Sequence, residues 1–190
     1  ARSTEDQEHR IFASSLDCPV GMKNPTHGSL KIAVNSILAA QHPHYIVFDG
    51  YEVKTAGNKY AHLVLRGSND SSNYGVEYIA EVNELFKKNQ VVNPAIIVDV
   101  SHDNCVIDGV KDHNEQANIV LRVMDSLKEK PELKNLVKGF MLESFIKEGR
   151  QNAESGNPID MSGLSITDPC LSWESTAKLI LEVAKQHAKG

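Results

Sequence analysis

Residues 94–102 read Pro-Ala-Ile-Ile-Val-Asp-Val-Ser-His and contain the clearest strand in the chain. Nearly every position is apolar, rather than every second one. That pattern is typical of a strand buried on both faces, as in a parallel sheet. The run ends in Ser101 and His102, which are side chains that can do chemistry. It therefore predicts both a parallel sheet and a functional site at the carboxyl end of this strand.

The rest of the chain alternates between strand-like and helix-like segments. Strands are predicted at about 18–22, 45–48 and 136–144, with a β-hairpin over 51–65 that turns at Gly57-Asn58. Apolar spacing predicts helices near 4–16, 29–41, 74–88, 112–128 and 174–188. We expect Ile11, Phe12 and Leu16 to face inward from the first helix, and Leu179, Ile180 and Val183 from the last. This rhythm indicates an α/β protein with parallel βαβ units, which is compatible with an open doubly wound sheet or with half of an eight-stranded barrel.

Composition limits the class of protein. The chain has 190 residues, with 41% hydrophobic and 24% charged residues, which suits one globular domain over 1–190 with no internal boundary. The net charge of −5 argues against a broad electrostatic surface for nucleic acid or acidic lipid. No apolar stretch is long enough for a membrane span. We expect a cytoplasmic protein.

The amino-terminal residues are too polar for a signal peptide and too acidic for a transit peptide. The chain does not begin with Met, and a helix-opening pattern starts at once at Ser3 and Thr4. We therefore expect the sequence to be a segment of a longer protein.

Polar side chains follow the apolar strands. His102, Glu143 and Asp168 offer one nitrogen and two carboxylates, a set that suits manganese, iron, cobalt or zinc. Parallel α/β folds gather the carboxyl ends of their strands at one edge, so these residues could meet there. The alternative is structural, since a histidine at a strand end is often simply hydrogen-bonded and strand-end carboxylates commonly cap the next helix.

A basic set stands out in this acidic chain. The set consists of Arg2, which precedes the first predicted helix, and Lys23 and Arg66, which directly follow predicted strands. If they converge, they could bind a small anion such as phosphate or carboxylate, with arginine giving bidentate contacts. Alternatively, each is a surface cation paired with a nearby acid.

The cysteines give no metal or disulfide signature. Cys18, Cys105 and Cys170 form no C-x-x-C pair and are expected to be reduced, inert, small hydrophobic residues. Cys105 follows His102 by three residues, so a ligand role is conceivable. Neither a G-x-G-x-x-G, a P-loop nor a G-x-S-x-G motif is present.

Six short motifs occur in a characteristic order along nearly the whole chain. They are Ala-Arg-Ser-Thr-Glu at 1–5, Pro-Val-Gly-Met-Lys-Asn at 19–24, Leu-Arg-Gly at 65–67, Asp-Val-Ser-His at 99–102, Met-Leu-Glu-Ser at 141–144 and Ser-Ile-Thr-Asp-Pro-Cys at 165–170. Each is weak alone. Together they resemble class I 3-deoxy-D-arabino-heptulosonate 7-phosphate (DAHP) synthase, the family that opens the shikimate pathway to the aromatic amino acids.

The resemblance implies a metal-dependent transferase that condenses phosphoenolpyruvate with erythrose 4-phosphate on a TIM (β/α)8 barrel. Matched position by position, Arg2 and Arg66 resemble the clamp on the phosphate of phosphoenolpyruvate, and Lys23 resembles the contact to its carboxylate. His102, Glu143 and Asp168 resemble three of the four metal ligands, the metal being manganese, iron, cobalt or zinc. Lys23 and His102 are the expected catalytic residues.

The resemblance also implies that only the second half of the barrel is present, as about four βα units plus an inserted β-hairpin. The family's fourth metal ligand, a cysteine, and its Lys-Pro-Arg-Thr stretch have no match here. A whole barrel needs roughly 250 residues. We therefore expect this chain alone to be inactive and to associate, either with a separate amino-terminal half or as a homo-oligomer (dimer or tetramer). Alternatives are the sibling 3-deoxy-8-phosphooctulonate synthase and a non-catalytic remnant that binds an anion.

Overall fold

The computed structural model describes residues 4–69, 71–154, 156 and 158–189 of an α/β protein. A four-stranded sheet is formed by β1 (Gly21–Lys23), β4 (His62–Leu65), β5 (Ile96–Asp99) and β8 (Val137–Met141). The strands lie in the order β1-β4-β5-β8, and every neighbouring pair is parallel. The predicted parallel sheet is therefore confirmed, and the spatial order of its strands follows their order along the chain.

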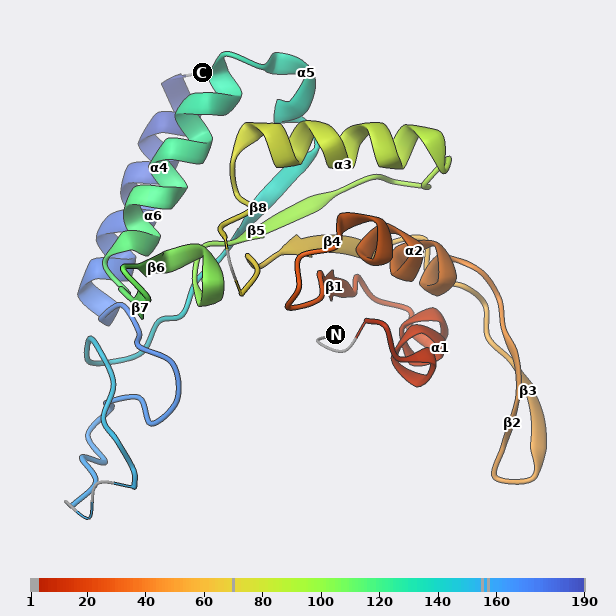
Figure 1. Cartoon of the computed structure of the whole chain (residues 1–190), viewed down its shortest axis with the longest axis horizontal. Helices are drawn as coiled ribbons and strands as arrows, with labels where there is room; N and C mark the ends of the chain where they lie inside the picture. The colour runs from red at the N-terminus through yellow and green to blue at the C-terminus, as the bar shows by residue number, and fades with distance from the viewer. Residues whose placement is uncertain (1–3, 70, 155, 157, 190) are drawn as a thin grey trace.

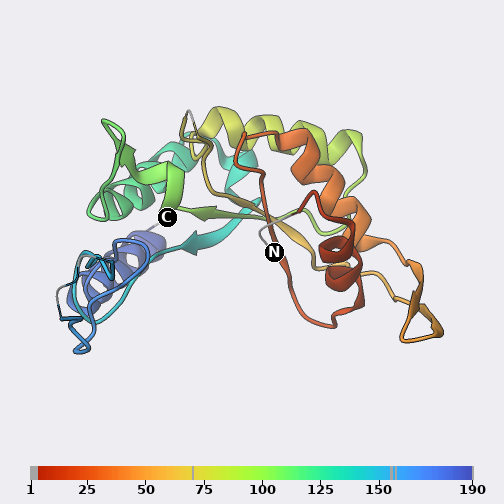
Figure 2. The same ribbon diagram turned by 60° about the horizontal axis from the view of Figure 1, so that its bottom comes forward.

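Helices connect the parallel strands. They are α2 (Leu30–Gln41) between β1 and β4, α3 (Val76–Lys88) between β4 and β5, and α4 (Glu115–Lys128) with the short α5 (Pro131–Lys134) between β5 and β8. In Figures 1 and 2, α2 and α3 lie beside one another on the same side of the sheet. α2 begins where predicted, because the side chain of Ser29 accepts a hydrogen bond from the Ile32 amide.

The core lies between the sheet and these helices. From the strands it takes Met22, Leu63, Leu65, Ile96 and Val98, each at most 1% exposed. From α2, α3 and α4 it takes Val34, Ile37, Ile79, Val82, Ile119 and Val120, which are equally buried. This continuous apolar packing fixes the carboxyl ends of the strands, where the candidate site lies.

The predicted hairpin is placed differently in the structure. The antiparallel pair is β2 (Tyr45–Phe48) with β3 (Tyr51–Lys54), and it turns at Asp49-Gly50, both with positive φ. An aspartate–glycine pair is the favoured two-residue hairpin turn. The expectation of a buried strand at 45–48 and a hairpin over 51–65 is therefore wrong. Figure 1 shows the β2–β3 hairpin projecting away from the sheet.

The terminal helices differ in detail from their prediction. α1 spans Gln7–Ser15 and is capped by Asp6, whose side chain accepts from the Glu8 amide. Phe12 was expected inside but is 65% exposed, because α1 buries its small residues Ala13 and Ser14 instead. In α6 (Trp173–Lys189), Leu179 is buried as expected, whereas Ile180 is exposed.

Two features lie at the carboxyl edge of the sheet, and the first of them was not predicted, whereas the second lies between the predicted strand at 136–144 and the predicted helix at 174–188. After β5, His102–Cys105 forms the short 3-10 helix η1, and a small hairpin follows, with β6 (Val106–Ile107) and β7 (Val110–Lys111). After β8, a long segment runs from residue 142 to 172 before α6 begins. Figure 1 shows this segment extending from the same end of the molecule as the β6–β7 hairpin.

The chain exposes more surface than a compact monomer of its mass. Its accessible area is 11112 Å², whereas a compact monomer of 20.9 kDa exposes about 9,000 Å². β1 and β8 are the outer strands of the sheet, so each lacks a second strand alongside within the described part of the chain. Among the described helices, none is both long and apolar enough to cross a membrane.

Candidate metal and anion site

The structure brings His102, Glu143 and Asp168 together. One ligand atom from each lies within 4.8 Å of the others. His102 Nε2 is 3.7 Å from Glu143 Oε1 and 3.9 Å from Asp168 Oδ2. His102 is buried, while the two carboxylates are about one-third exposed at 34% and 30%. The cluster therefore has a buried histidine side and an open carboxylate side.

Backbone pairing beyond β8 brings Asp168 to the cluster. The Leu171 amide donates to the Glu143 carbonyl at 2.9 Å, and the Phe145 amide donates to the Leu171 carbonyl at 2.9 Å. Gly149 and Cys170 exchange two further backbone hydrogen bonds. These contacts hold the chain just after Asp168 beside the chain just after Glu143, although the two acids are far apart in sequence.

The spacing of the donors around His102 suits a divalent cation. Two ligand atoms that share an ion at about 2.1 Å lie at most about 4.2 Å apart, and the separations of His102 from Glu143 and from Asp168 meet this limit. An imidazole with two carboxylates is a donor set of borderline hardness, which suits manganese, iron, cobalt or zinc. Three side chains leave coordination positions for water or a substrate oxygen.

Lys111 touches the cluster from the β6–β7 hairpin. Its Nζ donates to Asp168 Oδ1 at 2.7 Å, while Asp168 Oδ2 faces His102. One oxygen of Asp168 is thus paired with an ammonium group and the other faces the cation position. Lys111 has no local signal in the sequence, because the pairing depends on the β6–β7 hairpin, which was not predicted.

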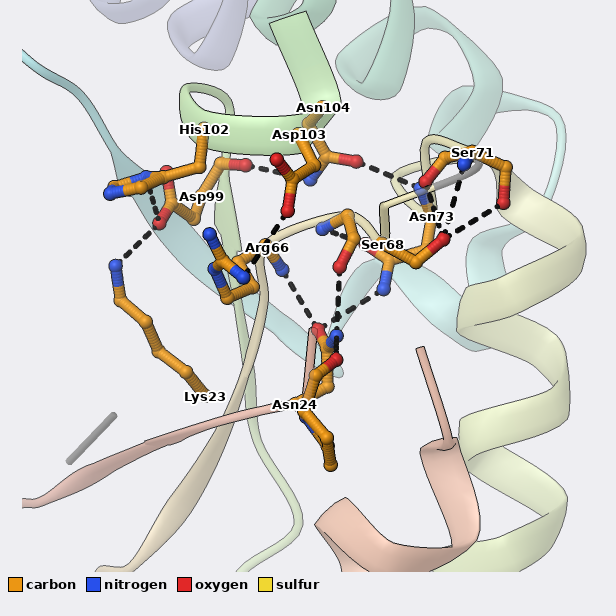
Figure 3. A network of polar contacts seen from close by, with 12 residues as sticks. Lys23, Asn24, Arg66, Ser68, Ser71, Asn73, Asp99, His102, Asp103 and Asn104 are labelled. Carbon is orange, nitrogen blue, oxygen red and sulfur yellow. Dashed lines mark hydrogen bonds and ion pairs between the residues drawn. The ribbon is translucent and has the colours of Figure 1, made fainter. Parts of the chain in front are cut away.

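Asp99 joins this cluster to a second group of charges. Asp99 is the last residue of β5 and is completely buried. Its Oδ2 accepts a hydrogen bond from Lys23 Nζ at 2.7 Å and lies 2.9 Å from His102 Nδ1 (Figure 3). Burial raises the pKa of Asp99, but the contacts with His102 and Lys23 lower it by more, so the net pKa lies below the ordinary value.

Arg66 has a separate acidic partner. It follows β4 directly, is 8% exposed, and its Nη1 lies 3.2 Å from Asp103 Oδ2. Gly67 allows this approach, since a side chain there would collide with the backbone of Asp103 and Asn104. The largely buried Lys23, whose side chain is 14% exposed, and the buried Arg66 are therefore cations with acidic partners, rather than surface cations surrounded by water.

A network of buried asparagines holds the ends of three strands together (Figure 3). Asn24 Oδ1 accepts from the Arg66 amide at 2.9 Å and from Asn73 Nδ2 at 3.1 Å, and its Nδ2 donates to the Gly67 carbonyl at 2.9 Å. Asn104 donates to the carbonyls of Leu65 and Asp99 and accepts from the Asn73 amide. The network fixes the backbone that carries the charged side chains.

Of the six predicted site residues, five are described. Lys23, Arg66, His102, Glu143 and Asp168 all lie at the carboxyl edge of the sheet. Arg2 lies outside the described residues. Asp99 and Asp103 were not predicted as site residues, although they stand in or beside the Asp-Val-Ser-His motif. For Asp99 the available signal was a charged residue within a buried apolar run, whereas Asp103 carries no such local signal.

The cysteines are free thiols, and Cys105 and Cys170 are buried. Burial raises the pKa of the Cys105 thiol and also that of the Cys170 thiol. Cys105 Sγ donates to the His102 carbonyl at 3.5 Å. The metal-ligand cluster found among the described residues does not include it.

Fold and cluster together define a parallel α/β protein with a candidate metal site at the carboxyl edge of its sheet. The sequence model of the DAHP synthetase I family matches residues 1–181, so the chain belongs to that family.

Individual relatives agree with this membership. The chain is 36% identical over 190 residues to a Trp-sensitive phospho-2-dehydro-3-deoxyheptonate aldolase of Enterobacter agglomerans, covering 97% of this chain and 52% of the relative. It is 38% identical to a Phe-sensitive aldolase of the same name from Escherichia coli K12, covering 97% and 51%. The structure of the aldolase from Francisella tularensis SCHU S4 superimposes with a TM-score of 0.82 at 30% identity, covering 98% of this chain and 53% of that one. The chain thus spans about half the length of these relatives.

Proposed function

We propose that this chain supplies the cation site and part of the phosphoenolpyruvate site of a DAHP synthase. The reaction is the condensation of phosphoenolpyruvate with erythrose 4-phosphate. The observation that carries the proposal is the convergence of His102, Glu143 and Asp168 within 4.8 Å, together with the cations Lys23 and Arg66, each paired with an acid at the same edge of the sheet. Family membership and the names of the relatives support the substrates.

In the proposed reaction, C3 of phosphoenolpyruvate attacks the aldehyde carbon of erythrose 4-phosphate. Water adds at C2, and phosphate then leaves by cleavage of its C–O bond. A divalent cation, which we propose to be manganese, iron, cobalt or zinc, would polarise the aldehyde oxygen when bound to His102, Glu143 and Asp168.

The residues of the chain orient and neutralise the anionic substrate. Lys23 would contact the carboxylate of phosphoenolpyruvate, and Arg66, together with Arg2, its phosphate. Lys23 is held at the end of β1 by Asp99, and the backbone of Arg66 is held by Asn24. Because Lys23 and Arg66 are ordered in advance, the substrate would meet charges that are already in place.

We further propose that residues 1–190 form one structural unit, the second half of a (β/α)8 barrel. Strands that follow one another around the sheet in chain order, with α2 and α3 on one side, favour a barrel over a doubly wound sheet, whose strand order reverses. The surface in excess of a compact monomer and the outer strands β1 and β8 suit pairing with further strands. By analogy with the family, we also propose that the protein forms a homo-oligomer and is located in the cytoplasm.

Calorimetry with phosphoenolpyruvate, in the presence and absence of Mn²⁺, tests the proposal. We expect Mn²⁺ to strengthen phosphoenolpyruvate binding, and His102→Ala to remove this effect. If phosphoenolpyruvate affinity does not depend on Mn²⁺ and is unchanged in His102→Ala, the chain would instead be a simple anion-binding protein.

A turnover assay of the isolated chain with Mn²⁺ and both substrates tests the half-barrel. We expect no turnover, since half of a barrel lacks the other half of its active-site edge. Turnover at the rate of an intact relative would refute this part of the proposal. Competition between erythrose 4-phosphate and arabinose 5-phosphate for binding would separate the proposed activity from that of the 8-phosphate sibling.

A further inference from the structure

One carboxylate oxygen serves two different groups at the edge of the sheet. Asp99 Oδ2 lies 2.7 Å from the ammonium of Lys23 and 2.9 Å from Nδ1 of His102. Lys23 belongs to the proposed anion side of the site and His102 to the proposed cation side. Asp99 therefore contacts one residue from each side of the site.

The position of Asp99 is fixed by its own contacts. Its Oδ1 accepts a hydrogen bond from the Ser101 amide at 3.1 Å, and its carbonyl accepts one from Asn104 Nδ2 at 2.7 Å. Its side chain has no exposed surface. A buried ion pair contributes little net stability compared with apolar residues of similar size. A buried charge that is this closely held is better explained by the groups that it orients.

His102 has Asp99 as the nearest acidic neighbour of its Nδ1. Its φ is +54°, a strained backbone value for a residue with a side chain. Nδ1 is buried and makes no well-aligned hydrogen bond, so the nearby Asp99 carboxylate is the acceptor available to it. A proton on Nδ1 leaves the lone pair of Nε2 free toward Glu143 and Asp168.

We propose that Asp99 is a positioning residue for both sides of the site. It holds the His102 ring with Nε2 toward the cation position and holds the Lys23 ammonium toward the anion position, so its replacement weakens both kinds of binding together. This inference rests on the proposed function for the identity of the two sites.

The experiment compares Asp99→Asn with the unaltered chain. A carboxylate that accepts a hydrogen bond from a metal-binding histidine typically contributes about tenfold to a hundredfold to metal affinity. We expect a loss of Mn²⁺ affinity in this range, measured by calorimetry. We expect phosphoenolpyruvate affinity to fall by about tenfold or more, because Lys23 loses its charged partner. The matched control is Asp125→Asn, which removes an exposed carboxylate paired with Lys128 and is expected to change neither affinity.

A second measurement separates positioning from a purely structural role. Nitrogen-15 NMR of the neutral His102 ring, recorded at alkaline pH without metal, should show the proton on Nδ1 in the unaltered chain. In Asp99→Asn the proton should redistribute between the two nitrogens. A fold-stabilising ion pair alone would not select a tautomer of His102.

The outcomes distinguish this inference from the proposed function. If the unaltered chain binds Mn²⁺ and Asp99→Asn binds both ligands within about threefold of it, the inference is wrong. If the unaltered chain binds no Mn²⁺, the proposed cation site is wrong, and the tautomer still decides the role of Asp99. A His102 proton on Nε2 in the unaltered chain overturns the inference even if Asp99→Asn does not fold.

Discussion

Lys23 and Asp99 are 76 residues apart in sequence, yet Lys23 Nζ lies 2.7 Å from Asp99 Oδ2. The two residues end β1 and β5, which are separated in the sheet by β4. Parallel pairing puts the carboxyl ends of all three strands at one edge, and the long lysine side chain spans the intervening strand. The contact thus follows from the sheet topology, and it supplies a charge pattern that neither residue could supply alone.

Replacement of Lys23 by Met should separate the two sides of the site. We expect phosphoenolpyruvate affinity to fall by about tenfold to a hundredfold, as for the loss of a hydrogen bond to a charged group. Mn²⁺ affinity should not fall, because Asp99 still faces His102 and no ligand is removed. Calorimetry with each ligand measures both, with the exposed Lys88→Met as a control. An equal loss of phosphoenolpyruvate affinity and of Mn²⁺ affinity would contradict the assignment of Lys23 to the anion side alone.

Asn24→Leu should destabilise the fold. Asn24 is 1% exposed, and its amide satisfies the Arg66 amide and the Gly67 carbonyl. Leaving these buried groups unpaired should lower the free energy of unfolding by about 2–4 kcal/mol. Urea denaturation followed by circular dichroism measures this. Asn118→Leu, at an exposed position of α4, should change it by less than about 0.5 kcal/mol. Similar values for the two variants would refute the role of the network.

Leu63→Ala should be costly and Val47→Ala should not. Leu63 in β4 is fully buried, so its truncation should lower the free energy of unfolding by about 3 kcal/mol. Val47 in the β2–β3 hairpin is 79% exposed, so its truncation should cost less than about 0.5 kcal/mol. The same urea titration measures both. A large cost at Val47 would mean that the hairpin is covered in solution.

The thiols should differ in reactivity with pH. Burial raises the pKa of Cys105 and of Cys170, so at any given pH a smaller fraction of each is the reactive thiolate. Cys18 is exposed and should react first with a disulfide reagent near neutral pH. Reaction at the buried pair should become appreciable only as the pH rises above the ordinary thiol range. Cys18→Ser should abolish the fast phase, and its persistence would contradict this assignment.

The sequence predicted the structure and the site best where a short apolar strand is followed directly by a polar, potentially functional side chain. β5 was predictable because its residues are apolar on both faces, and His102, Glu143 and Asp168 were found because they follow strands. The hairpin was misplaced because two glycine turns competed. Asp49-Gly50 makes the hairpin turn, whereas Gly57 is needed because its backbone lies against the Gln41 carbonyl at the end of α2. Only the folded chain shows that second requirement.

The partners of the site residues could not be read locally. Asp103 pairs with Arg66 and Lys111 with Asp168 through contacts between distant segments. The side chains that bear the expected chemistry were therefore predictable from strand ends, whereas the groups that orient them depend on sheet order and on loop paths. Asp99 is the clearest case, because its contacts with Lys23 and His102 form only when β1 and β5 come together in the sheet.

Mn²⁺ binding to the purified chain tests the cation site most directly. Electron paramagnetic resonance of free Mn²⁺ during titration should show one bound ion per chain. Binding should be lost in His102→Ala, which removes the nitrogen ligand, and kept in His187→Ala, which removes an exposed histidine of α6. Mn²⁺ binding that survives His102→Ala unchanged, or no binding by the unaltered chain, would contradict the proposed site.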